Sequence, residues 1–83
     1  MDFRISAAEE ATLFAIVEQL DEGNAPTPAE LTKAVGRDAS SDVRSLARKG
    51  WILVREVDGH PTVISLSPLA TAAVRNLRFG QRE

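Results

Sequence analysis

Residues 25–50 read APTPAELTKAVGRDASSDVRSLARKG, and this stretch decides the fold. It opens on Thr27-Pro28-Ala29-Glu30, a capping box in which the threonine oxygen accepts the amide of the third helical residue and proline takes the first helical position. The apolar side chains Leu31 and Val35 share one face, and Gly36 supplies the residue type that commonly ends a helix. The sequence therefore predicts a short helix that begins at Pro28 and ends before Gly36.

A second helix follows this turn directly. Ala39, Val43 and Leu46 recur at helical spacing, and Gly50 marks the end, so the pattern predicts a helix over residues 38–49 that Asp38 caps. Two short helices with a glycine between them are the sequence pattern of a helix-turn-helix.

An earlier helix is expected over residues 7–22. Ser6-Ala7-Ala8-Glu9 is a second capping box, and Gly23-Asn24 ends the segment. The apolar residues between these signals fall on one broad face: Leu13, Phe14, Ile16, Val17 and Leu20. This helix is expected to form much of the core.

The residues after Gly50 predict a β-hairpin over 51–66. Residues 51–57 are rich in β-branched and apolar side chains, Asp58-Gly59 is a strong hairpin-turn signal, and residues 62–66 form the return strand. Because proline is disfavoured in a ladder, we expect a four-residue tip from Asp58 to Pro61. Trp51, at the entry to the hairpin, is expected to be a core residue.

A final helix is predicted over residues 68–79, since Ser67-Pro68 repeats the cap-then-proline start and Gly80 can end it. Four residues are expected to face the core: Leu69, Ala72, Ala73 and Leu77. Val74 and Phe79 lie off that stripe and are candidates for end-of-helix packing or self-association. A homodimer through helix 7–22 or helix 68–79 is one possible assembly.

Composition and charge narrow the class of protein. The chain has 83 residues, 43% of them hydrophobic, and no cysteine, which predicts one globular domain, 1–83, without disulfides. No apolar run approaches the length of a membrane span, and the N-terminus lacks a signal-peptide pattern, so we expect a soluble, cytoplasmic protein. The net charge of −2 is polarised: residues 1–30 carry −6, and residues 31–60 and 61–83 carry +2 each.

The order of three helices, a two-stranded hairpin and a C-terminal helix resembles the α+β winged helix-turn-helix domain, over about residues 6–79. Residues 26–31 and 46–52, PTPAEL and LARKGWI, are similar to the corresponding parts of bacterial SOS-type repressors and other small winged-helix regulators. The resemblance implies a sequence-specific regulator of transcription, such as a repressor, that binds double-stranded DNA. Helix 38–49 would enter the major groove, and hairpin 51–66 would be the wing.

With the apolar side of helix 38–49 turned inward, its hydroxyl and basic residues are expected to face DNA. Arg44 is the candidate for guanine, because a guanidinium can bond both major-groove acceptors of that base. Asp38 and Asp42 lie at or near the same face and oppose this interpretation. The full set of predicted DNA-binding residues is Lys33, Arg37, Ser40, Ser41, Arg44, Arg48, Lys49, Arg55 and His60.

The sequence also bears on two other classes of function, a protein-interaction module and an enzyme. A winged-helix protein-interaction module, such as an adaptor or a phage or plasmid inhibitor, would fit the acidic total and the short 36–50 segment; its contact surface would be the acidic face of the first helix, Glu9, Glu10, Glu18, Asp21 and Glu22. An enzyme is not expected, because one histidine without cysteine or tyrosine cannot build the common nucleophile–base pairs or metal clusters. No cofactor or metal is predicted.

Overall fold

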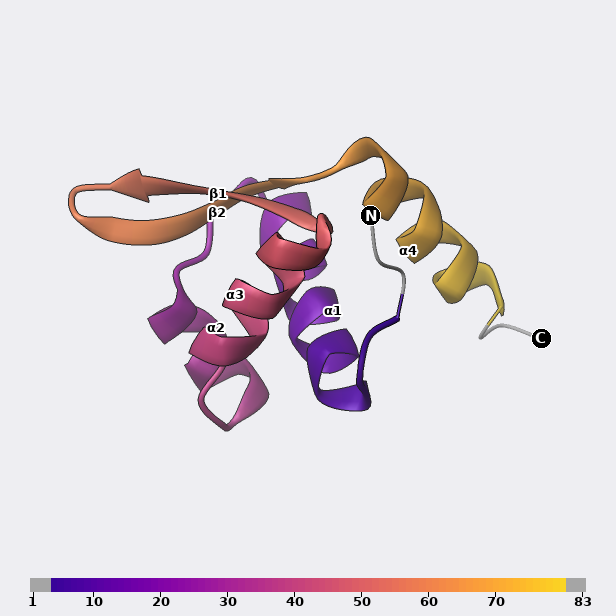
Figure 1. The fold of residues 1–83 in the computed structure, drawn as a ribbon, viewed down its shortest axis with the longest axis horizontal. Helices are drawn as coiled ribbons and strands as arrows, with labels where there is room; N and C mark the ends of the chain where they lie inside the picture. The colour runs from indigo at the N-terminus through magenta and orange to yellow at the C-terminus, as the bar shows by residue number, and fades with distance from the viewer. Residues whose placement is uncertain (1–3, 81–83) are drawn as a thin grey trace.

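The computed structural model describes residues 4–80, and the side chains of residues 77–80 lie outside that description. Along the chain, the elements are α1 (Ala7–Asp21), α2 (Pro28–Val35), α3 (Ser40–Lys49), β1 (Ile52–Val57), β2 (His60–Leu66) and α4 (Pro68–Gly80). Figure 1 shows the hairpin projecting to one side of the three-helix body and α4 lying on the other side. The predicted α+β order of three helices, hairpin and helix is confirmed.

Both predicted capping boxes are present. The Ser6 hydroxyl accepts the Glu9 amide at 3.1 Å, and the Glu9 carboxylate accepts the Ser6 amide at 2.9 Å. Thr27 and Glu30 repeat the arrangement at the start of α2, with distances of 3.3 and 3.0 Å. Gly36 ends α2 with φ of 79°, a left-handed conformation that costs glycine little. Local sequence therefore sets where α1 and α2 begin and where α2 ends.

The core lies between the first three helices and the base of the hairpin. The predicted inward residues of α3, Ala39, Val43 and Leu46, are buried, and so is Trp51. The remaining buried apolar residues come from every other element or its end: Leu13, Ile16, Val17, Leu31, Ile52, Val63, Ala70 and Val74. The helical spacing of apolar residues in 7–50 thus identified the core side of α1 and α3 correctly.

The start of α3 differs from the prediction. The helix predicted over 38–49 begins at Ser40. Asp38 precedes the helix, and its carboxylate accepts the Ser40 amide at 3.0 Å. That backbone hydrogen bond is the main reason that the pKa of Asp38 lies below its ordinary value. The Ala39 amide donates to the Thr32 hydroxyl at 3.0 Å, which ties the turn to α2.

The predicted four-residue hairpin tip is wrong. Asp58 and Gly59 alone form the turn, with φ of 53° and 79°, and Val57 pairs with His60. Positive φ at both central residues is typical of the two-residue type I′ turn, whose twist matches that of the flanking strands. Pro61 pairs with Glu56 inside the ladder, which a two-stranded sheet tolerates because each strand is an edge.

One hydrogen bond ties the hairpin to the segment before α2, and a second closes the base of the hairpin. The Val63 amide donates to the Pro26 carbonyl at 2.9 Å, and the Ser67 amide donates to the Trp51 carbonyl at 3.0 Å. A register shift at Leu53/Val54 interrupts the regular pairing of the strands. The base of the hairpin is therefore held beside α2, while its turn extends away from the helices (Figure 1).

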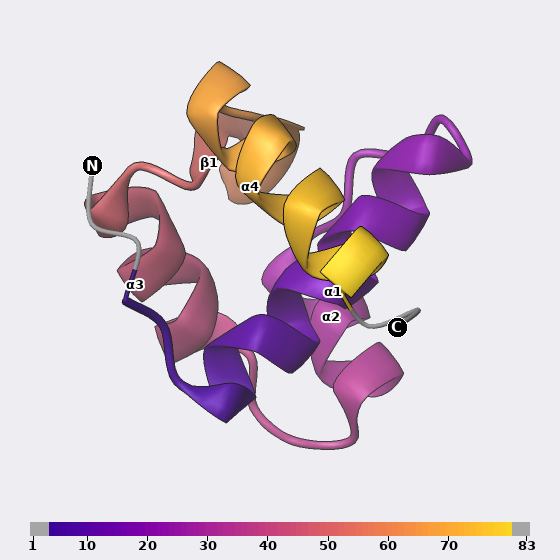
Figure 2. The same cartoon turned by 90° about the vertical axis from the view of Figure 1, so that its right-hand side faces the viewer.

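The predicted core side of α4 is wrong for Leu69 and Ala72. Ala70 and Val74 are buried, whereas Leu69 is 60% exposed and Ala72 is exposed. Ala73 is half-buried, and the predicted side chains of Leu77 and Phe79 lie outside the described residues. Because α4 is rich in alanine, several of its faces have similar hydrophobicity. The buried face is therefore set by how α4 packs against the rest of the protein. Figure 2 looks onto α4, which crosses in front of α1.

Candidate functional site

The exposed side of α3 carries two arginines. Arg44 and Arg48 are exposed four residues apart, and Ser40 and Ser41 are exposed in the first turn of the same helix. Within the described part of the chain neither guanidinium makes a hydrogen bond or an ion pair. Residues four apart lie on one helical face, so both cations are available to a ligand from the same direction.

Lys49 does not share that side of α3. Its ammonium lies 3.0 and 3.1 Å from the two carboxylate oxygens of Glu9 and donates to the Arg4 carbonyl at 2.7 Å. The side chain is 23% exposed and reaches towards the start of α1. The structure therefore places Lys49 in a contact between α1 and α3, and not beside Arg44 and Arg48, with which it is predicted to bind DNA.

Arg37 is engaged in the same interhelical region. Its guanidinium forms an ion pair with Asp42 at 2.6 Å and donates to the Ala8 carbonyl at 2.6 Å. Asp42 also accepts from the Thr12 hydroxyl at 2.9 Å and is only 8% exposed. Asp42, which was predicted to oppose an anionic ligand, is thus turned towards α1 and neutralised by Arg37.

Glu9 joins the N-terminal cap of α1 to α3. One carboxylate oxygen of Glu9 accepts the Ser45 hydroxyl at 2.6 Å. The same carboxylate accepts the Ser6 amide and forms an ion pair with Lys49. The Ser45 hydroxyl, followed by the Ser6 amide, lowers the pKa of Glu9 from 4.5 to about 2. Because Glu9 is 8% exposed, it cannot belong to the acidic contact surface predicted for α1. Glu18, Asp21 and Glu22 are exposed, and Glu10 is partly buried.

Acid should weaken this contact in a defined pH range. The folded-state pKa of Glu9 is below the value of 4.5 for an unperturbed carboxyl, so its ionised form stabilises the fold above that pH. We expect about 2 kcal/mol of unfolding free energy to be lost as the pH falls from about 4.5 to about 2. Urea unfolding at a series of pH values measures this loss.

Glu9→Gln is the control for that pH dependence. Glutamine keeps the capping-box geometry but cannot ionise, and the lowered pKa of Asp38 remains in both proteins. The variant should therefore show a shallower decline in stability below about pH 4.5. Parallel declines in the two proteins would mean that Glu9 has no special role in acid unfolding.

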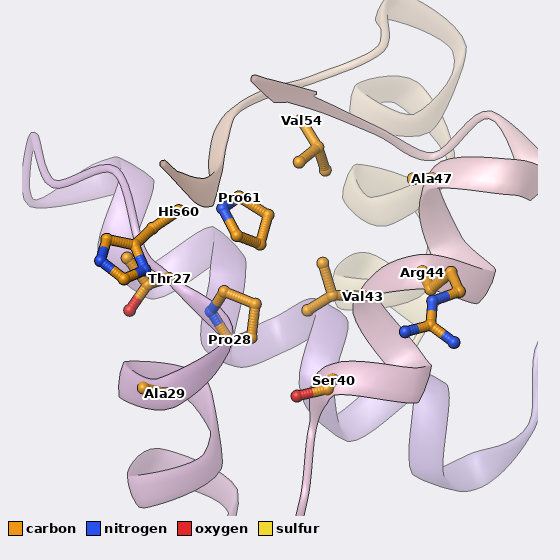
Figure 3. Close-up of a pocket in the computed structure, with 10 residues that line it drawn as sticks. All are labelled: Thr27, Pro28, Ala29, Ser40, Val43, Arg44, Ala47, Val54, His60 and Pro61. Carbon is orange, nitrogen blue, oxygen red and sulfur yellow. The ribbon is translucent and has the colours of Figure 1, made fainter. Parts of the chain in front are cut away.

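A groove lies beside the arginine-bearing side of α3. Its volume is about 670 Å³, and its walls come from the start of α2, one side of α3 and the hairpin. In Figure 3, Val43, Val54 and Pro61 converge on its apolar centre, and Arg44 stands at the edge. The lining residues are Thr27, Pro28, Ala29, Ser40, Val43, Arg44, Ala47, Val54, His60 and Pro61.

The predicted site residues divide into three groups. Ser40, Arg44 and His60 line the groove, and Arg37 and Lys49 are bound to α1. The others are exposed outside the groove lining: Lys33, Ser41, Arg48 and Arg55. Sequence reasoning missed the groove, because Pro28, Ala47 and Val54 come together only when the hairpin folds over α2 and α3. It also missed the partners of Arg37 and Lys49.

Comparison with family models, with curated proteins and with solved structures gives no match to this chain. Between residues 4 and 80, no helix has both the length and the apolar character needed to cross a membrane. In that same range no three histidine, aspartate or glutamate side chains gather as metal ligands would. The main chemical features of the described surface are two exposed arginines on α3 and the apolar groove beside them.

Proposed function

We propose that this chain is a winged helix-turn-helix regulator that binds double-stranded DNA in a sequence-specific manner. The observation that carries the proposal is the pair of exposed guanidinium groups of Arg44 and Arg48 on α3, which have no partner among the described residues. An α-helix fits the major groove of B-DNA. The acid of α3, Asp42, is buried and paired with Arg37, so it does not oppose a phosphate or a base on the exposed side. The hairpin, held beside α2, would act as the wing.

Arg44 and Arg48 would read bases, and the first turn of α3 would position the helix. A guanidinium bonds both major-groove acceptors of guanine, and each such pair is worth about 1–3 kcal/mol of discrimination. The exposed hydroxyls of Ser40 and Ser41 lie at a helix N-terminus, where phosphate oxygens are favoured. Lys33 and Arg55 are exposed cations that would contact the phosphate backbone on either side.

The internal ion pairs limit how many phosphates one copy can neutralise. With Arg37 and Lys49 bonded to α1, four exposed cations remain on α2, α3 and the hairpin: Lys33, Arg44, Arg48 and Arg55. Four phosphate contacts would give a logarithmic salt slope of about −3 to −4, which is the upper limit for one copy, and the slope is smaller in magnitude where Arg44 and Arg48 bond bases instead. One copy would bind weakly at physiological salt, so we propose a homodimer on two half-sites. Leu69, 60% exposed on α4, supplies apolar surface for self-association.

Removing either arginine of α3 tests the proposal. Because the target is unknown, duplexes are first selected from a random pool with the wild-type protein, and affinity is then measured by fluorescence anisotropy. We expect Arg44→Ala and Arg48→Ala each to weaken binding by about 10-fold, and the double variant by about 100-fold. Arg75→Ala is the matched control, since it removes an exposed arginine from α4 and should change affinity little.

The salt dependence separates base contacts from charge alone. Loss of one phosphate contact lowers the magnitude of the slope by about 1, whereas loss of a base contact relaxes the sequence preference. Arg44→Ala should therefore change which duplexes are preferred. If the double variant binds the selected duplex as tightly as wild type, α3 is not the DNA-binding element.

A second candidate function is recognition of another protein, favoured by the surface of the hairpin. Leu53 and Val57 are 52% and 47% exposed, and the hairpin also carries the exposed acids Glu56 and Asp58. Exposed apolar patches mark protein contacts more often than phosphate contacts. The wild-type protein can be passed over immobilised nonspecific DNA at low salt. If the column does not retain it, recognition of a protein is favoured over the DNA-binding regulator.

A further inference from the structure

We infer that the groove between α2, α3 and the hairpin binds a small organic anion that has an apolar body. Its volume of about 670 Å³ falls within the range of small-ligand sites, about 300–1,000 Å³. Such sites combine a mainly apolar lining with a few polar groups that orient the ligand. This groove has that composition.

The apolar part of the lining comes from α2, α3 and the hairpin. Pro28 belongs to α2, Val43 and Ala47 belong to α3, and Val54 and Pro61 belong to the two strands. Their side chains face one another across the groove in Figure 3. A hydrocarbon or aromatic group placed between them would remove apolar surface of all three elements from water, which is the main favourable term for such a ligand.

The charge of the lining selects an anion. Arg44 is the one lining residue with a permanent charge, and the lining contains no carboxylate. Its guanidinium is exposed and makes no ion pair in residues 4–80, so it can turn over the groove opening without breaking an internal contact. A guanidinium binds a carboxylate through two parallel hydrogen bonds. The ligand chemistry that fits is therefore an aryl or alkyl carboxylate.

Binding of such a ligand would compete with DNA. Arg44 belongs both to the groove lining and to the exposed side of α3, and a carboxylate that pairs with it would withhold it from a base. This regulatory consequence rests on the proposed DNA-binding function. Binding of the anion itself does not, so the two can be tested separately.

The test titrates phenylbutyrate into the isotopically labelled full chain and follows backbone amide shifts by NMR. A ligand of this size should bind with a dissociation constant of about 1 mM. The shifts should concentrate at Val43, Ala47 and Val54. Phenylbutyramide, a neutral ligand of the same shape, should move the same amides but bind about 3- to 5-fold more weakly, because an exposed ion pair adds only modestly to affinity.

Paired variants locate the site. Val54→Asp puts a carboxylate into the groove and should weaken phenylbutyrate at least about 10-fold, whereas Leu53→Asp makes the same change at the adjacent exposed residue outside the lining and should have little effect. Arg44→Gln should remove the preference for phenylbutyrate over phenylbutyramide, and Arg48→Gln should preserve it. Circular dichroism before each titration establishes that the variants are folded.

Three results would overturn the inference. The wild-type protein could bind acid and amide equally, the shifts could lie outside the groove, or Val54→Asp and Leu53→Asp could behave alike. A final measurement adds phenylbutyrate to the protein on its selected duplex, where release of DNA is expected. If the NMR results hold and no duplex can be selected, the anion site stands and the DNA-binding function fails.

Discussion

Trp51→Ala should lower the free energy of unfolding by about 3–5 kcal/mol, the largest loss expected from a single substitution in this protein. Trp51 is 2% exposed and is one of the largest side chains in the core. Truncating a buried aromatic residue typically costs about 3–5 kcal/mol, because apolar contacts are lost and a cavity remains. A domain of 83 residues has a total stability of only about 4–12 kcal/mol, so the loss is a large fraction of the whole.

Urea unfolding followed by circular dichroism measures this effect, because the variant lacks the only tryptophan of the chain and gives no indole fluorescence signal. Trp51→Phe is the control: it keeps an aromatic ring in the core and should lose less than half as much stability. A different outcome has a clear meaning. If Trp51→Ala retains wild-type stability but loses affinity for a selected duplex, the indole is a ligand contact and its burial contributes little.

Glu9→Ala should produce the second largest effect, a loss of about 3 kcal/mol in unfolding free energy. The substitution removes the acceptor for Ser45, the partner of Lys49 and one half of the capping box of α1. Among the described residues, it leaves the half-buried ammonium of Lys49 with the Arg4 carbonyl as its one remaining hydrogen-bond partner. Breaking one side of a mostly buried ion pair costs more than the pair contributes, because the remaining charge is left uncompensated.

Thermal unfolding of Glu9→Ala beside Glu10→Ala measures the loss. Glu10 is the adjacent half-exposed acid and forms no side-chain hydrogen bond or ion pair in the described residues, so its truncation should cost less than about 0.5 kcal/mol. A double-mutant cycle with Lys49→Met isolates the ion pair from the cap. Equal melting temperatures for Glu9→Ala and Glu10→Ala would show that the contact between α1 and α3 contributes little.

The helix pair was predictable because its signals are local. The Thr27 cap, Gly36 and the spacing of Ala39, Val43 and Leu46 each act within a turn or two of the chain, and the structure retains all of them. The sequence predicts the hairpin and its Asp58-Gly59 turn signal, but the predicted four-residue length of the tip is wrong. Pro61 does not end the strand, because a strand in a two-stranded sheet has a free edge that accepts proline.

The roles of the charged residues of α3 could be predicted only in part. Asp42 lies among the buried residues Ala39, Val43 and Leu46, so helical spacing could have placed it on the inner side. The contacts of Asp42 with Thr12 and of Lys49 with Glu9 cannot be read from the sequence, because these partners lie 30 and 40 residues apart. Arg37 is only five residues from Asp42, but their ion pair forms where the turn before α3 packs against α1. Helical periodicity gives the side of a helix on which a charge lies, whereas its partner depends on which helix packs there.

The sequence by itself determined the order of the elements, the start of α1 and α2, the turn between α2 and α3, and the apolar side of α1 and α3. These follow from capping, glycine conformations and spacing, which need only neighbouring residues. The tertiary structure alone decided that Arg37 and Lys49 bind α1 while Arg44 and Arg48 stay exposed, that α4 buries Ala70 and Val74, and that α2, α3 and the hairpin enclose a groove. Each of these depends on the distance between side chains far apart in the chain, which packing sets and local sequence does not.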